Sequence, residues 1–205
     1  MSIYMPTPVV TRRTGLLSVV AAALIVLSQI LRLGIGFMLG SDSATTVAHT
    51  VTYSLALLGM FALILALTAI YASESSALGR LGLIGYVTAL LGTLLVAGDW
   101  WFEAFAVPVI AKESPAVLDL PPGGSILTGA IATLAVYTIG WLLFAIACFR
   151  IEAIPRPAAA LLVVGALAGP LALSTPYQIP LALAIGWIGV ASQPTKSPGH
   201  GGVPS

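Results

Sequence analysis

The sequence predicts an all-α protein, a polytopic bundle of six transmembrane helices, and three observations lead to this prediction. Hydrophobic residues make up 59% of the 205 residues, against about 45–50% in soluble domains. Charged residues make up 7%, against about 25% in soluble domains, which is too few to cover a water-exposed surface. The apolar residues also fall into runs whose lengths suit a bilayer. These observations exclude a water-soluble enzyme and a disordered chain.

The apolar runs follow one another with mostly short connections. They cover residues 15–39, 51–72, 81–110, 126–149, 158–173 and 179–191. A spanning helix needs about 17–25 apolar residues, so the first four runs are long enough. The last two are shorter, and Pro170, Pro176 and Pro180 lie in or between them. Six spans are the leading prediction, and five spans plus a re-entrant final segment are the alternative.

Lysine and arginine are concentrated in alternate connecting segments of the chain. Their positions in these segments are Arg12, Arg13, Arg80 in a loop over residues 73–80, Arg150, Arg156 and Lys196. Since cytoplasmic segments are enriched in Lys and Arg, both termini are predicted to be cytoplasmic. The predicted organisation is therefore a cytoplasmic N-terminal segment (1–13), a six-helix membrane domain (14–192) and a flexible cytoplasmic tail (193–205).

Ionisable residues inside the spans mark candidate functional sites, because they are costly to place in a bilayer. At 1.5 Å per residue, Arg32 lies about 26 Å along the first run and Asp99 about 27 Å along the third, in the same direction. Glu103 lies one turn beyond Asp99 on the same helix face. His49 and Tyr53 begin the second run at that level. The sequence thus predicts an outward-facing polar pocket for a ligand or ion, formed by these five residues.

The same residues also have structural interpretations. Arg32 can extend to the outer headgroups, with Trp100 and Trp101 as interfacial anchors in the aromatic belt. Alternatively, Arg32 forms a structural ion pair with Asp99 or Glu103. The sequence leaves these interpretations open beside the pocket.

Helix packing is expected to depend on small residues, because lipid supplies no hydrophobic force between membrane helices. Gly165 and Gly169 form a GxxxG pair in the fifth run, and Gly85 with Ala89 forms a similar pair in the third. Such pairs support a compact bundle and carry no functional information.

No catalytic residue, cofactor or metal site is predicted. His49 and His200 are the two histidines, and they lie on opposite sides of the membrane in this topology, which excludes bis-histidine haem ligation within one chain. Cys148 is the one cysteine, so a multi-cysteine metal site is also excluded. The net charge of +1 provides no field that would attract nucleic acid. A membrane-embedded enzyme or redox subunit that uses His49 is the least favoured hypothesis.

Several short segments carry a family resemblance. They include Ala-Ile-Tyr-Ala at 69–72, Arg-Leu-Gly-Leu-Ile-Gly at 80–85, Trp-Phe-Glu-Ala-Phe-Ala-Val-Pro at 101–108, Gly-Trp-Leu-Leu-Phe at 140–144 and Gly-Trp at 186–187. With these segments the chain resembles a group of bacterial, actinobacterial-type multi-pass membrane proteins of unknown function, over most of residues 14–192. The resemblance implies their topology and a place in the bacterial plasma (inner) membrane. It also implies that Glu103 and its aromatic neighbours belong to a recurring pattern, and it brings no catalytic residues.

Two functions are compatible with this sequence. The leading hypothesis is a non-catalytic accessory or scaffold subunit, with the lipid bilayer and other membrane subunits or further copies of the chain as partners. Little of the chain is left outside the bilayer to do other work. The alternative is a binding or transport protein for a small solute, lipid or ion, including proton-coupled transport, which uses the outer-leaflet pocket. Carboxylates at membrane depth favour this alternative, because a simple scaffold does not need them.

Overall fold

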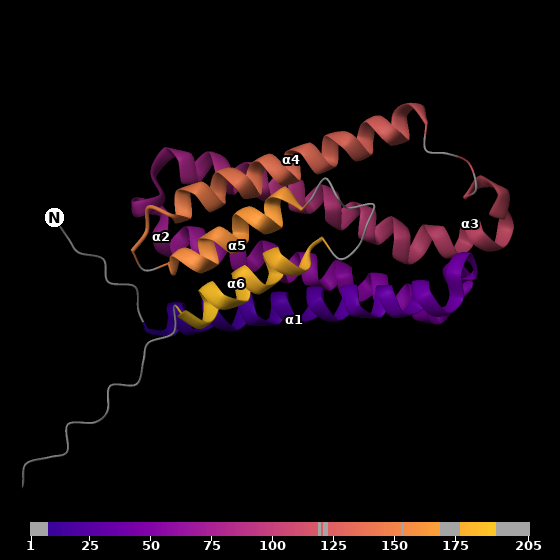
Figure 1. The fold of residues 1–205 in the computed structure, drawn as a ribbon, viewed down its shortest axis with the longest axis horizontal. Helices are drawn as coiled ribbons and strands as arrows, with labels where there is room; N and C mark the ends of the chain where they lie inside the picture. The colour runs from indigo at the N-terminus through magenta and orange to yellow at the C-terminus, as the bar shows by residue number, and fades with distance from the viewer. Residues whose placement is uncertain (1–7, 119, 121–122, 153, 169–176, 192–205) are drawn as a thin grey trace, which may run out of the picture.

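The computed structural model describes residues 8–118, 120, 123–152, 154–168 and 177–191, and they contain helices and no strand. The long helices are α1 (Pro8–Leu39), α2 (Val47–Trp101) and α4 (Gly124–Cys148), and the shorter ones are α3 (Val107–Glu113), α5 (Arg156–Leu167) and α6 (Ile179–Ala191) (Figure 1). Short irregular helical segments lie between some of them. Two are 3-10 helices, η1 (Gly40–Thr45) and η3 (Pro115–Val117), and one is a π-helix, η2 (Phe102–Ala106). The predicted all-α class is confirmed. The predicted tail over 193–205 lies outside the described residues, and α1 begins within the segment predicted to precede the membrane domain.

Among the described residues, three helical stretches are long and apolar enough to cross a membrane. They are Thr14–Gly36, the 67-residue stretch Val47–Glu113, and Gly124–Cys148. α5 and α6 have 12 and 13 residues, or about 18–20 Å of helix, against a hydrocarbon core of about 30 Å. The chain is thus a membrane protein by the length and composition of its helices, and its last two helices are shorter than a full crossing.

α2 folds back on itself at Gly79, whose φ of 60° and ψ of −157° interrupt the helix. The two halves are antiparallel, because Tyr71 stacks on Tyr86 with ring centroids 4.3 Å apart, while Tyr53 and Trp100 lie 5.5 Å apart further along the pair. The expected loop over residues 73–80 is therefore wrong. Helical structure continues to within one residue of the turn on both sides, since a single glycine reverses the chain direction.

Replacing Gly79 with alanine is expected to destabilise the fold by about 1–3 kcal/mol, because this backbone conformation is essentially restricted to glycine. A Cβ at Gly79 would meet nothing within 4 Å, so the loss would come from the backbone alone. Gly34→Ala is the matched control, since Gly34 is helical and also has open space around it. Thermal unfolding in detergent measures both variants. Equal melting temperatures for the two would contradict the prediction.

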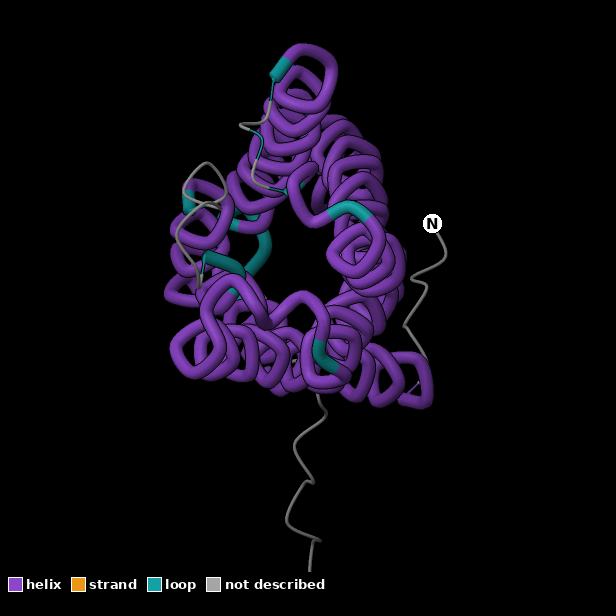
Figure 2. The backbone as a smooth tube through the Cα atoms, turned by 90° about the vertical axis from the view of Figure 1, so that its right-hand side faces the viewer, coloured by secondary structure: helices purple, strands orange, loops and turns teal. Residues whose placement is uncertain are grey.

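α5 and α6 form a short antiparallel pair beside the N-terminal half of α1. Gly165 of α5 lies so close to the backbone of Leu181 in α6 that a Cβ would be 2.5 Å from the Leu181 nitrogen. A Cβ at Gly186 of α6 would likewise come too close to the Cβ of Ala22 in α1. Gly165 thus serves in helix packing as predicted from its sequence pattern, while Gly169 lies outside the described residues. Each helix packs on the next around the long axis, in the order α1, α2, α4, α5, α6 and back to α1 (Figure 2).

The densest part of the core lies between the second half of α2 and α4. Glycines let the two backbones touch: Gly92 faces the backbone of Tyr137, and Gly140 faces that of Ala89. Fully buried aromatic side chains fill the adjacent space, and the indole Nε1 of Trp141 donates a hydrogen bond to Thr93 Oγ1 at 3.1 Å. This packing fixes the position of the second half of α2, which carries the predicted pocket residue Asp99 and leads into η2, which carries Glu103.

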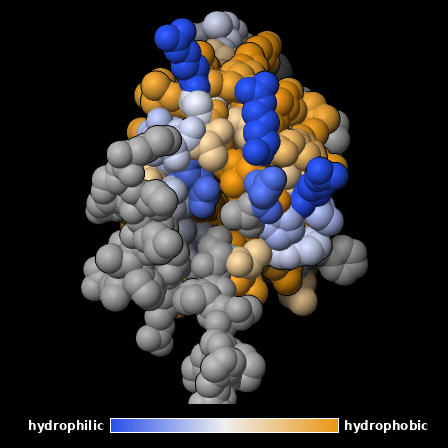
Figure 3. Space-filling model, turned by 90° about the vertical axis from the view of Figure 1, so that its left-hand side faces the viewer, coloured by the Kyte–Doolittle hydropathy of each residue, from blue (hydrophilic) through white to orange (hydrophobic). Residues whose placement is uncertain are grey.

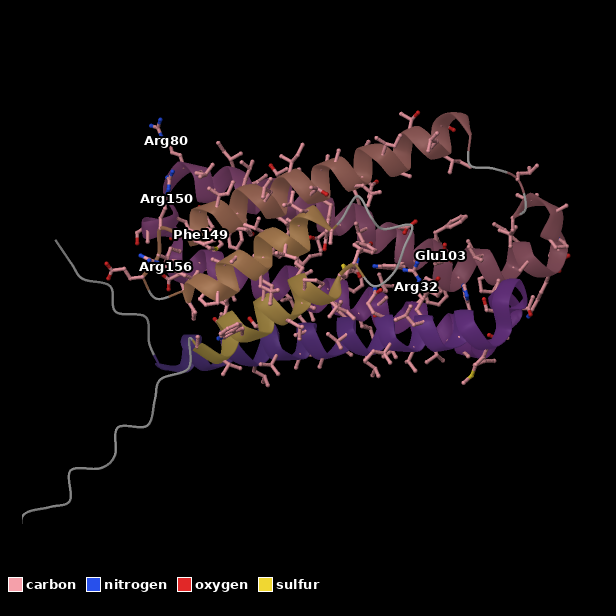
Figure 4. The ribbon with its side chains drawn as sticks, in the orientation of Figure 1. Arg32, Arg80, Glu103, Phe149, Arg150 and Arg156 are labelled. Atoms are coloured by element: carbon pink, nitrogen blue, oxygen red, sulfur yellow. The ribbon has the colours of Figure 1, made fainter. Side chains whose placement is uncertain are left out.

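The two ends of the bundle differ in charge. Arg80, Arg150 and Arg156 all lie at the end where α1 begins and α6 finishes (Figure 4). Seen from that end, hydrophilic residues project from a largely hydrophobic body (Figure 3). Arg32 and Glu103 lie towards the opposite half of the molecule (Figure 4).

Candidate functional site

Four of the five predicted pocket residues line one cavity of about 460 Å³. They are Arg32, Tyr53, Asp99 and Glu103, and Trp100 and Tyr177 line it with them. The N-terminal half of α4 supplies another wall, which is lined by Ser125, Ile126, Gly129, Ala130, Thr133 and Leu134. The constant rise of a helix explains why residues so distant in sequence meet at one depth.

Arg32 is half-buried and lies between aromatic rings. Its guanidinium carbon is 5.9 Å from the ring centroid of Tyr53 and 5.4 Å from that of Trp100, which are cation–π distances. Asp99 and Glu103 are close enough to interact electrostatically with Arg32. Among the described residues, however, Arg32 forms no ion pair within 4.0 Å. The expected structural ion pair is therefore wrong, because the cation and the carboxylates line the same cavity without touching.

The two neighbouring tryptophans have different environments. Trp101 is 54% exposed, as an interfacial anchor would be, whereas Trp100 is 3% exposed and lines the cavity. The prediction that both are interfacial anchors is therefore wrong for Trp100. Adjacent residues on a helix point about 100° apart, so one ring faces the outside while the other faces the bundle. The indole Nε1 of Trp100 is buried and has no hydrogen-bond partner among the described residues.

His49, the fifth predicted residue, is held by an irregularity in the chain. In the π segment η2, the N–H of Val107 donates to the carbonyl of Phe102, five residues earlier. Pro108 has no N–H, so the carbonyl of Glu103 receives no donor from the following turn. His49 supplies one, with its Nε2 3.0 Å from the Glu103 carbonyl oxygen. A carbonyl only accepts, so Nε2 carries the hydrogen.

This bond changes the role expected for His49. Its Nε2 is also 3.7 Å from a carboxylate oxygen of Glu103, and its ring lies 4.3 Å from that of Tyr53. His49 therefore positions the π segment and the Glu103 carboxylate, and its Nε2 does not accept a proton. Among the residues that the structure describes, no group of three His, Cys, Asp or Glu is placed to hold a metal ion.

Replacing His49 with alanine is expected to destabilise the protein by about 1–3 kcal/mol, because the Glu103 carbonyl then loses its donor in a partly buried place. His49→Gln retains an N–H donor and is expected to recover a substantial part of the loss. Thermal unfolding of both variants in the same detergent measures the difference. If the glutamine variant is as unstable as the alanine variant, the hydrogen bond is not what holds the segment.

A second cavity of about 400 Å³ adjoins the first. Its lining includes Arg32, Tyr53, His49, Thr52 and Ser43. Arg32 and Tyr53 line both cavities, so the arginine is the shared cation of a wider polar region between α1 and α2.

A buried chain of polar side chains leads to Tyr177, which lines the larger cavity. Gln29 Nε2 donates to Gln178 Oε1 at 2.9 Å, and Gln178 Nε2 donates to the Tyr177 hydroxyl at 2.9 Å. Tyr177 and Gln178, directly before α6, therefore lie beside the part of α1 that contains Gln29. Gln29 was missed, although its spacing of three residues from Arg32 puts both on one face of α1.

No family model, curated protein or solved structure matches this chain.

Proposed function

We propose that this chain is a multi-pass plasma-membrane protein, bacterial as its resemblance implies, that binds a small charged ligand in the cavity around Arg32. The arginine-rich end at Arg80, Arg150 and Arg156 supports a cytoplasmic placement of both termini. In this orientation the cavity belongs to the outer leaflet. The short lengths of α5 and α6 support a re-entrant hairpin from the cytoplasmic side in place of two full spans.

One observation carries the proposal. Arg32 is half-buried and faces Asp99 and Glu103 across a cavity instead of pairing with them. Charged groups in a low-dielectric place are costly unless they are paired, so a purely structural arrangement would bring them together. Groups of opposite charge that lie apart around a cavity are instead typical of a binding site, where the ligand supplies the partners of both charges.

Changing a cavity carboxylate tests the proposal. In native mass spectrometry of protein extracted gently from its own membranes, we expect a bound small mass on the wild type. Glu103→Gln and Asp99→Asn are expected to reduce its occupancy about tenfold, because a charge-assisted hydrogen bond contributes about 1.5–3 kcal/mol. Glu113→Gln is the matched control, since Glu113 ends α3 and does not line the cavity.

The accessory-subunit hypothesis predicts a different spectrum. A stoichiometric second polypeptide, with no small mass that depends on Asp99 or Glu103, would overturn the binding proposal and favour a scaffold role. A bound mass that is equally occupied in the wild type and in both cavity variants would also contradict it, because the cavity would then not be the binding site.

A further inference from the structure

We propose that the ligand is a zwitterionic phospholipid with a primary amine in its headgroup, of the phosphatidylethanolamine type, which enters sideways from the outer leaflet between α1 and α4. This inference rests on the proposed function and specifies its ligand. Three observations support it: the charges in the cavity are separated, the aromatic rings already contact Arg32, and α5 and α6 are short.

The cavity offers one place for an anion and another for a cation. The guanidinium of Arg32, with its fork of N–H donors, suits a phosphate. The hydroxyls of Tyr53 and Tyr177 belong to residues that line the same cavity and add further donors. Asp99 of α2 and Glu103 of η2 lie one helical turn apart, and their carboxylates can accept hydrogen bonds from an ammonium group. A ligand with both charges satisfies both sets, whereas a simple anion or cation leaves one set unmatched.

The aromatic rings indicate which kind of amine fits. Quaternary ammonium groups are recognised by the faces of aromatic side chains. In this cavity the rings of Tyr53 and Trp100 already face the guanidinium of Arg32, at 5.9 and 5.4 Å. The cation of the ligand is left with the carboxylates of Asp99 and Glu103, which require N–H donors. A primary ammonium supplies three such donors and a choline headgroup supplies none.

The lengths of the helices leave a way in from the bilayer. Gln178, directly before α6, bonds to Gln29 of α1, so residues 30–39 of α1 extend beyond α6. In α4 the first buried residue is Tyr137, and residues 124–136 are exposed or half-buried. Among the described residues, α1 and α4 make no extensive contact with each other. Asp99 is accordingly exposed, as expected for a cavity that is open to its surroundings.

The cavity size and its apolar wall suit a lipid headgroup whose chains stay in the bilayer. About 460 Å³ is within the range of small-ligand pockets, roughly 300–1,000 Å³. The wall of α4 that faces Arg32 is largely apolar, with Ile126, Ala130 and Leu134. Acyl chains attached to a headgroup at Arg32 would leave along this wall towards the outer leaflet.

The test uses the full-length protein in detergent and native mass spectrometry, with phosphatidylethanolamine, phosphatidylglycerol and phosphatidylcholine of identical acyl chains. We expect the wild type to prefer phosphatidylethanolamine over both others by about tenfold, as one additional charge-assisted interaction implies. Glu103→Gln is expected to reduce the preference over phosphatidylglycerol, because the amine loses one of its two charged acceptors while the phosphate keeps Arg32. Glu113→Gln is expected to leave the preference unchanged.

Two further measurements test whether the ligand comes from the bilayer and whether it binds in this cavity. Water-soluble phosphoethanolamine is expected to compete poorly, and equal binding of the soluble headgroup would overturn entry from the bilayer. Ala130→Phe fills the apolar wall without changing any charge, and it is expected to reduce lipid occupancy about tenfold in a folded protein. Equal retention of all three lipids would overturn the choice of ligand, even if a different small mass still depends on Asp99 and Glu103. Loss of that dependence would instead overturn the proposed function.

Discussion

Replacing Gly140 with leucine is expected to prevent α4 from packing on α2 and to leave little folded protein. A Cβ at Gly140 would fall on the backbone of Thr88 and Ala89, and backbone in the middle of a packed helix cannot move aside as a side chain can. Overpacking of a core costs about 1–3 kcal/mol even when side chains adjust, so we expect a larger loss here. Thermal unfolding and size-exclusion chromatography in detergent measure it.

The matched control for this substitution is Gly98→Leu. Gly98 is also a helical glycine, on α2, but a Cβ there would meet nothing within 4 Å. The added side chain would point into open space, and the variant is expected to remain folded. If both leucine variants unfold at the same temperature, close approach of the two helices does not stabilise the bundle.

Replacing Arg32 with glutamine is expected to weaken binding of phosphatidylethanolamine and phosphatidylglycerol alike, by roughly ten- to a hundredfold. Both lipids carry a phosphate, and the loss of charge-assisted hydrogen bonds worth about 1.5–3 kcal/mol corresponds to that change in Kd. The fold should persist, because Arg32 forms no ion pair among the described residues. Lipid titration followed by native mass spectrometry measures the change in Kd.

Lys112→Gln is the control for this second prediction. Lys112 is a cation in the last turn of α3 and does not line the cavity, so its loss changes the charge of the protein without touching the site. If this variant weakens lipid binding as much as Arg32→Gln does, general electrostatic attraction explains the binding and the cavity does not.

Regular helix geometry explains why much of the site was predictable. The depth of Arg32 and Asp99 follows from the length of chain between each residue and the start of its apolar run, and the four-residue spacing of Asp99 and Glu103 puts both on one face. The four predicted residues of the larger cavity lie together for this reason. The same reasoning could not reveal that Arg32 stays apart from the carboxylates, since that separation depends on how α1 packs against α2.

Other features depend on irregularities that periodicity does not detect. The side chains of Trp100 and Trp101 could not be assigned to the inside or outside without knowing which face of α2 meets the bundle. The role of His49 depends on Pro108, which leaves a carbonyl without a donor five residues earlier. α5 ends at Leu167, whereas the apolar run predicted a helix to residue 173, and residues 169–173 lie outside the described residues.

The turn at Gly79 has a mechanical consequence for the cavity. Arg80, next to the turn, and Asp99 lie in one continuous helical segment, and nineteen residues of rise separate them, or about 28 Å. In a rigid segment of this length, a small tilt at one end produces a large displacement at the other. A tilt of about 6° at the glycine would move Asp99 by about 3 Å, since displacement grows with distance along the rod. That distance is comparable to the length of a hydrogen bond, so a force applied at the Gly79 end of this helix would change the width of the cavity at its other end.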